Sequence, residues 1–281
     1  DIAYFIDSGS DGSIYIAGKH ETFKTNEYGA NLSYNIPTIS KLNPDGEIIW
    51  NKILDEYGDF NHNIRNFILG DDDSIYMTGS TFDNLDGQVN SGGGDAYIAK
   101  FNKDGSKEWT RLFGTSENDS GKFITTGSDG AIYILGYTSD YDGGINSGTS
   151  APTISKFNPD GTKVWTNLID YDGSSSIYFH NINIGSDDAI YISGYTNGRL
   201  DGQTHYGNWD GFITKLNSKG GKDWTRVIGT SKNDYFFSLT SEVDSNIYVK
   251  GWTYDNDVYQ YKNFIIKLAN LFSPTDISLS S

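Results

Sequence analysis

The chain has 281 residues and is acidic, with 37 Asp and Glu against 21 Lys and Arg and a formal net charge of −16. This charge excludes nucleic acid as a ligand, because binding to a phosphate backbone requires clustered lysine and arginine. The absence of cysteine excludes a disulfide framework, a thiolate metal site and a thiol nucleophile. The sequence contains no run of 18 apolar residues, so membrane insertion is not predicted. The 33 glycines and 20 tyrosines, against a single methionine, favour short strands joined by tight turns.

One motif, Asp-x-x-Ile-Tyr-x-x-Gly, recurs along the chain with steps of 57 to 61 residues. Its tyrosines are Tyr15, Tyr76, Tyr133, Tyr191 and Tyr248. A tryptophan follows the first four copies with steps of 56 to 59 residues, at Trp50, Trp109, Trp165 and Trp224. Two markers with nearly the same period predict a repeated structural unit.

Each unit contains four strand signals separated by turn signals. In the third unit, the signals fall near residues 122–126, 131–137, 153–158 and 163–168. Asp-Gly turns join the first to the second strand and the third to the fourth, and a longer glycine-rich loop joins the middle pair. The second strand is apolar on both faces, as a sheet packed between two neighbours requires. One unit is therefore predicted to be an antiparallel meander, which is one blade of a β-propeller.

The expected fold is all-β, a β-propeller over residues 1–270 with about five four-stranded antiparallel blades. The repeats lie near residues 1–58, 59–117, 118–174, 175–232 and 233–270. The fifth unit has no tryptophan strand, so we expect an incomplete last blade whose fourth strand comes from elsewhere, or further blades upstream of Asp1. Residues 271–281 are expected to be a linker or the start of a following domain.

Several segments resemble the bacterial SBBP-type β-propeller repeat, namely residues 127–138, 85–105 and 108–115. Residues 273–280, Ser-Pro-Thr-Asp-Ile-Ser-Leu-Ser, resemble the opening strand of a cadherin-like repeat. The resemblance implies a large bacterial surface protein, extracellular or at the cell surface, with domains flanking this one. It also implies a binding, adhesion or scaffold module, in a family with seven blades where five are counted here.

The loops between the second and third strands carry the candidate calcium ligands. These are Asp86, Asn90, Asp95, Asp142, Asn146, Asp201 and Asp210. Carboxylate, amide and carbonyl oxygens are the ligands that calcium prefers. Their spacing fits neither an EF-hand nor a calcium-binding nonapeptide repeat, and Asp or Asn before Gly also shapes ordinary turns. Calcium is the one cofactor that the sequence predicts.

Aromatic residues after the second strands and in the following loops are the candidate ligand-binding residues. The predicted set is Tyr137, Tyr195, Trp209 and Trp252. Aromatic faces beside polar groups suit sugars, so the predicted partner is a glycan or a protein surface. A tyrosine-rich composition also produces such clusters by chance.

No catalytic residue is predicted. The four histidines, at positions 20, 62, 180 and 205, occupy different places in the repeat, and no nucleophile motif is present. We therefore expect a module that is not an enzyme. The alternative is a glycan-active propeller hydrolase that uses loop carboxylates. A buried carboxylate pair would favour the hydrolase, whereas open aromatic pockets repeated in successive blades would favour the binding module.

Overall fold

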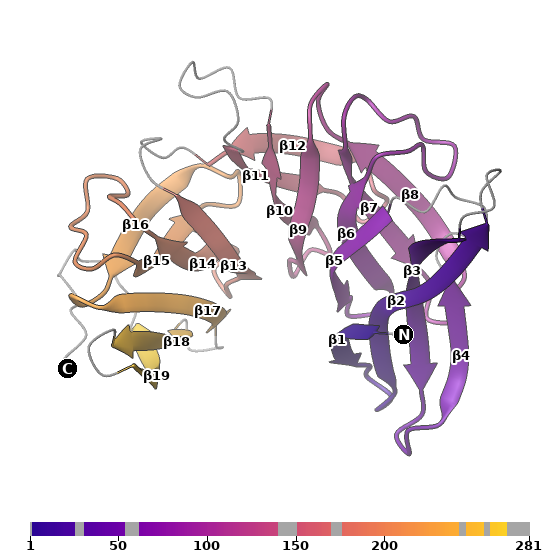
Figure 1. Cartoon of the computed structure of the whole chain (residues 1–281), viewed down its shortest axis with the longest axis horizontal. Helices are drawn as coiled ribbons and strands as arrows, with labels where there is room; N and C mark the ends of the chain where they lie inside the picture. The colour runs from indigo at the N-terminus through magenta and orange to yellow at the C-terminus, as the bar shows by residue number, and fades with distance from the viewer. Residues whose placement is uncertain are drawn as a thin grey trace. The chain divides into compact units, whose positions relative to one another are not determined.

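A computed structural model describes residues 2–25, 31–53, 62–139, 151–169, 176–241, 246–255 and 259–268. Within these ranges all regular structure is β-strand, arranged in five sheets (Figure 1). The described residues include no helix with the length and apolar character needed to span a bilayer. The chain divides into two compact units, one formed by Asp1–Ile124 with Gly130–Thr166, the other by Thr125–Asp129 with Asn167–Ser281.

The first unit is built from three sheets, each with its strands in chain order. The first sheet contains β1 (Ile2–Ser8), β2 (Ile14–Thr25), β3 (Asn31–Leu42) and β4 (Ile48–Ile53). The second contains β5 (His62–Leu69), β6 (Ile75–Thr81), β7 (Asp95–Phe101) and β8 (Lys107–Phe113). The third contains β9 (Asp119–Thr126), β10 (Ile132–Thr138), β11 (Ala151–Phe157) and β12 (Lys163–Leu168), of which the last residues of β9 and β12 fall in the second unit.

The second unit is built from two sheets. The fourth sheet contains β13 (Ile177–Ile184), β14 (Ile190–Thr196), β15 (Asp210–Leu216) and β16 (Lys222–Ile228). The fifth contains β17 (Asn233–Ser241), β18 (Ile247–Asp255) and β19 (Gln260–Leu268). The predicted antiparallel blades are therefore confirmed, including a last blade with three strands where the others have four.

Short polar turns close the hairpins as the Asp-Gly signals predict. In the first, the Asp11 carboxylate accepts a hydrogen bond from the Ser13 amide at 3.0 Å, and Gly12 takes a left-handed conformation with φ of 78°. Asp73 fills the place of Gly12 in the second sheet, with φ of 59°. Asp is one of the few residues that tolerate this conformation. The motif therefore accepts either Gly or Asp at this position.

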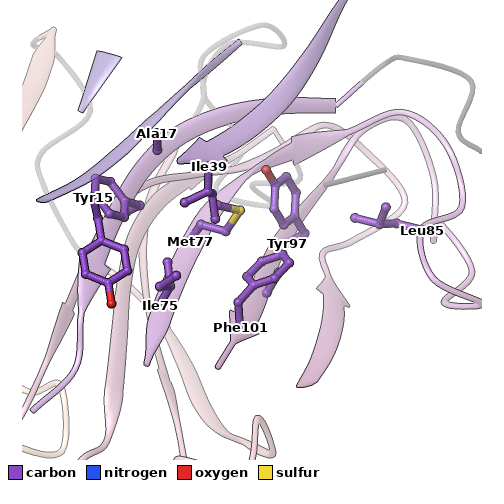
Figure 2. Close-up of a cluster of buried hydrophobic side chains, with 10 residues drawn as sticks. Tyr15, Ala17, Ile39, Ile75, Met77, Leu85, Tyr97 and Phe101 are labelled. Carbon is purple, nitrogen blue, oxygen red and sulfur yellow. The ribbon is translucent and has the colours of Figure 1, made fainter. Parts of the chain in front are cut away.

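The core lies between sheets, which explains the apolar character of both faces of the second strands. One cluster joins the first two sheets through Tyr15, Ala17, Ile39, Phe67, Ile75, Met77, Leu85, Tyr97, Ala99 and Phe101, all buried (Figure 2). A second cluster, which includes Ile213, Phe236 and Val249, joins the two sheets of the second unit. Each sheet buries side chains against its neighbour within the unit.

The repeated tyrosine and tryptophan pack against each other within each of the four sheets that contain both. The ring centroids of Tyr15 and Trp50 lie 6.1 Å apart, and Lys41 Nζ lies 4.9 Å from the centroid of the Tyr15 ring. The other face of the tryptophan meets the next sheet: a Cβ on Gly105 would lie 3.2 Å from Trp50. The glycine of the Asp-Gly turn is therefore needed for packing between sheets as well as for its own conformation.

Candidate functional site

The second unit carries a continuous strip of aromatic side chains, which we call the aromatic strip. Its members are Tyr178, Tyr195, Trp209, Tyr235, Trp252 and Tyr261. They come from both sheets of the unit: β13, β14 and the residue before β15, then β17, β18 and β19. Tyr178 is 47% exposed and Tyr261 is 65% exposed, while the four rings between them are half-buried. The strip is therefore open to solvent at both of these residues.

Neighbouring rings of the strip are in direct contact. The Tyr178 and Tyr195 rings stack with centroids 5.1 Å apart, and the Tyr195 and Tyr235 rings meet edge to face at 4.7 Å. Tyr235 and Trp252 are 4.1 Å apart, and Trp252 and Tyr261 are 5.0 Å apart. These separations lie near or within the range in which aromatic pairs attract each other.

Strand register places these rings side by side. Tyr178 pairs with Tyr195 across β13 and β14, and Tyr235 pairs with Trp252 across β17 and β18. The glycine before each second-strand aromatic lets the first strand approach closely, since a Cβ on Gly251 would lie 2.5 Å from the Tyr235 carbonyl oxygen. The two sheets are joined next to the strip, where the Asp234 amide donates a hydrogen bond to the Trp209 carbonyl oxygen at 2.7 Å.

Three of the four aromatic residues predicted from the sequence lie together in the strip: Tyr195, Trp209 and Trp252. The fourth, Tyr137, lies on β10 in the first unit, where its cross-strand partner is Pro152. Tyr178, Tyr235 and Tyr261 also belong to the strip but were not predicted from the sequence. The first two lie on first strands, directly across from the aromatic residue that follows the motif glycine, and this register was the signal that could have found them.

Two buried carboxyl groups, those of Asp210 and Asp234, lie next to the strip. Both side chains are fully buried, and each adjoins a strip residue in the chain. Asp210 accepts hydrogen bonds from the amides of Tyr206 at 2.5 Å and Gly207 at 3.2 Å, and His205 Nε2 lies 3.5 Å from its Oδ2. Asp234 Oδ2 accepts hydrogen bonds from the amide and hydroxyl of Thr230 at 2.7 and 2.9 Å.

These surroundings favour a proton on Asp210. Burial raises the pKa of the Asp210 carboxyl, and the negative charge of Asp234 acts in the same direction. The Tyr206 and Gly207 amides and His205 oppose the shift without reversing it. A carboxyl group whose pKa is raised by burial keeps its proton to higher pH than an ordinary carboxyl group, which is the direction a general acid requires.

The same carboxylate arrangement occurs in the first unit without the aromatic strip. Asp95 is fully buried there, and both Asp95 and Asp119 lie next to Gly114. A Cβ on Gly114 would lie 2.5 Å from Asp95 Oδ1 and 2.9 Å from Asp119 Oδ2. Gly94 and Ser120 stand where the second unit has Trp209 and Tyr235. The carboxylate arrangement is therefore common to both units, and the aromatic strip distinguishes the second.

The predicted calcium ligands that the structure describes do not form one cluster. Asp86 and Asp201 take left-handed turn conformations and contact lysines, with Lys107 Nζ 2.8 Å from Asp86 and Lys222 Nζ 2.5 Å from Asp201. Asn90 closes its own loop by accepting a hydrogen bond from the Gly92 amide.

Asp142 and Asn146 lie outside the described residues. Among the residues that the structure does describe, no three His, Asp or Glu side chains form a group that could hold a metal ion. Calcium stays a prediction.

Comparison with known proteins gives the fold. No protein-family model matches the chain, so the SBBP and cadherin-like resemblances have no support from that source. A curated relative, the regulatory protein FlaEY of Caulobacter vibrioides, is 24% identical over 196 residues, which are 61% of this chain and 20% of that protein. The chain thus spans about a fifth of this relative.

Two solved structures match nearly the whole chain at a TM-score of 0.50. A luciferin-regenerating enzyme is 8% identical, and the match covers 99% of this chain and 95% of that one. The polysaccharide lyase Uly1 is 11% identical, and the match covers 94% of this chain and 57% of that one. Together with the five sheets, these matches define a multi-blade β-propeller-like protein.

The prediction that the chain is not an enzyme is wrong on this comparison, because the proteins that share its fold over nearly the whole chain are enzymes. The physical reason is that a propeller scaffold does not determine function, which resides in side chains placed on it. At such low identity the matches show the fold alone.

Proposed function

We propose that the protein is a glycan-active β-propeller whose aromatic strip binds a sugar chain. The observation that carries this proposal is the unbroken contact of six aromatic rings, from the exposed Tyr178 to the exposed Tyr261, with four half-buried rings between them. A run of this length offers faces to several consecutive sugar units. The fold match to a polysaccharide lyase agrees with this substrate class.

The chemistry of the strip suits carbohydrate. Aromatic faces pack against the C–H faces of sugar rings, and tyrosine hydroxyls hydrogen-bond to sugar hydroxyls. Burial raises the pKa of Tyr195 and Tyr235, so both phenols keep their protons at neutral pH and can donate hydrogen bonds. The strip thus offers both stacking and polar contacts to a neutral, hydroxyl-rich ligand.

The test is calorimetric titration of the full chain with a panel of oligosaccharides. We expect Tyr178→Ala and Tyr261→Ala each to weaken binding about fivefold to tenfold, which corresponds to about 1 kcal/mol for one stacking contact. Both side chains are substantially exposed, so the fold should tolerate their removal. The matched control is Phe23→Ala, since Phe23 is a 66% exposed aromatic residue on β2 of the other unit. Equal weakening by all three variants would refute the strip as the binding surface.

A catalytic role rests on a second observation, the raised pKa of the buried Asp210 beside Asp234. A pair of carboxyl groups is the arrangement used in glycoside hydrolysis, in which an acid protonates the leaving oxygen and water attacks the sugar. We infer that Asp210 is the acid of such a pair.

The corresponding test follows glycan cleavage by the release of reducing ends. Asp210→Asn should abolish cleavage and leave oligosaccharide binding within about twofold of wild type, because the acid acts only in the transition state. If wild type cleaves no member of the panel, the catalytic role is refuted while the binding proposal stands.

A further inference from the structure

The first strand of four sheets contains a bulge at the same place. The register with the second strand shifts between Ala3 and Phe5, Ile64 and Asn66, Phe179 and Asn181, and Phe236 and Ser238. The residues at the bulges are Tyr4, Arg65, His180 and Phe237. A bulge locally disrupts the ladder and redirects the side chain at that point.

The third sheet has Lys122 at the equivalent position. A Cβ on Gly79 would meet the carbonyl oxygen of Asn63, and a Cβ on Gly136 would meet that of Ser120, so Asn63 and Ser120 correspond. Two residues later come Arg65 in β5 and Lys122 in β9. The first unit therefore has Tyr4, Arg65 and Lys122 at the bulge positions of three consecutive sheets.

A cavity of about 370 Å³ opens beside two of these residues, between the first sheet and β5. Tyr4, Phe5, Pro37 and Ile64 supply aromatic and apolar walls. Lys19 and Arg65 supply two positive charges. The volume is within the range of small-molecule sites and has room for a single sugar residue.

Lys19 and Arg65, which line the cavity, and Lys122, whose charge acts on Arg65, have no acidic partner among the described residues. Lys19, Arg65 and Lys122 make no ion pair in the described part of the chain, although the protein has a net charge of −16. Lys19 Nζ lies 5.9 Å from the centroid of the Tyr4 ring. Burial lowers the pKa of Lys122, and the positive charge of Arg65 lowers it further, so these two groups repel each other. An anion in the cavity, beside Arg65, would offset this repulsion.

We propose that this cavity, which we call the cationic pocket, binds the carboxylate of an acidic sugar residue. The planar guanidinium of Arg65 is suited to hold a carboxylate through two parallel hydrogen bonds, and Lys19 adds a second charge. The Tyr4 ring offers a face for the sugar ring. The identification of the ligand as a sugar rests on the proposed function, whereas the preference for an anion rests on the pocket alone.

The experiment is calorimetric titration of the full chain with glucuronate, glucose and inorganic phosphate at low ionic strength. We expect glucuronate to bind, glucose to bind at least tenfold more weakly, and phosphate to compete poorly because it cannot use the aromatic wall. Arg65→Gln and Lys19→Gln should each weaken glucuronate binding about tenfold. The control Arg199→Gln removes another exposed arginine, from the other unit, and should leave binding unchanged.

Three results would overturn the proposal: equal affinity for glucose and glucuronate, equal weakening by Arg199→Gln, or no effect of Arg65→Gln. Displacement of glucuronate by equimolar phosphate would leave a general anion site and refute the sugar. Circular dichroism of each variant, matched to wild type, excludes unfolding as the cause. Tyr178→Ala separates the two proposals, because it should weaken oligosaccharide binding and leave glucuronate binding unchanged.

Discussion

Phe236 joins the two sheets of the second unit, and its removal should cost more stability than that of any exposed aromatic residue. Its side chain is fully buried, its ring lies 5.7 Å from that of Phe264 in the same sheet, and a Cβ on Gly211 of the neighbouring sheet would collide with the ring. Burial of about 170 Å² at about 25 cal/mol per Å² corresponds to about 4 kcal/mol. Phe236→Ala should therefore lower the free energy of unfolding by about 3–5 kcal/mol, as for other buried phenylalanines.

The assay is equilibrium urea unfolding followed by tryptophan fluorescence. Phe236→Leu retains most of the volume and should cost about 1–1.5 kcal/mol. Phe23→Ala removes the same side chain from an exposed position and should change stability by no more than about 0.5 kcal/mol. A loss below about 1.5 kcal/mol for Phe236→Ala, or one equal to that of Phe23→Ala, would refute the claim that the two sheets depend on this contact.

Three further predictions concern charged groups. The pKa of Asp210 is raised above 3.8 in the folded state, so wild-type stability should fall, relative to Asp210→Asn, as pH rises above about 4 and through the folded-state pKa; parallel curves would contradict the shift. The hydrogen bonds from Lys103 and Ser10 lower the pKa of Asp73 from 3.8 to about 2, so wild type should lose stability as pH falls through this interval while Asp73→Asn does not; acid titration by circular dichroism checks the difference. If calcium binds, millimolar calcium should raise the midpoint of thermal unfolding, and EDTA should reverse the rise. Asp95→Asn should abolish this rise, because one buried Asp95 oxygen has no hydrogen-bond partner among the described residues and is free to bind the ion.

The repeated sheets were predictable because their signals are local. The motif tyrosine, the Asp-Gly turns and the missing tryptophan strand of the fifth unit each lie within a few residues of the element that they specify. The start of β9 was predicted near residue 122 and lies at Asp119, whose amide donates a hydrogen bond to the Gly94 carbonyl oxygen at 2.5 Å. This contact joins two sheets, and a single repeat cannot reveal it.

The candidate site was only partly predictable for the same reason. Asp95 and Asp210 were identified as oxygen ligands in loops, but their neighbours Asp119 and Asp234 begin the next sheet, about 24 residues further along the chain. Tyr178 and Tyr235 lie on first strands, which vary most between repeats. Their contact with Tyr195 and Trp252 depends on the register between strands, which the composition of either strand alone does not determine.

The bulge position has a consequence for how such a protein can acquire new ligands. Tyr4, Arg65, Lys122, His180 and Phe237 differ in size, charge and polarity, yet each stands at the equivalent place in its sheet. The residue needed for strand pairing is the glycine on the second strand. It faces the carbonyl group that lies two positions before the bulge on the first strand, and it lets the two backbones approach closely. Because pairing and side-chain identity are specified by different residues, a single substitution per blade can change recognition without a matching change in the scaffold.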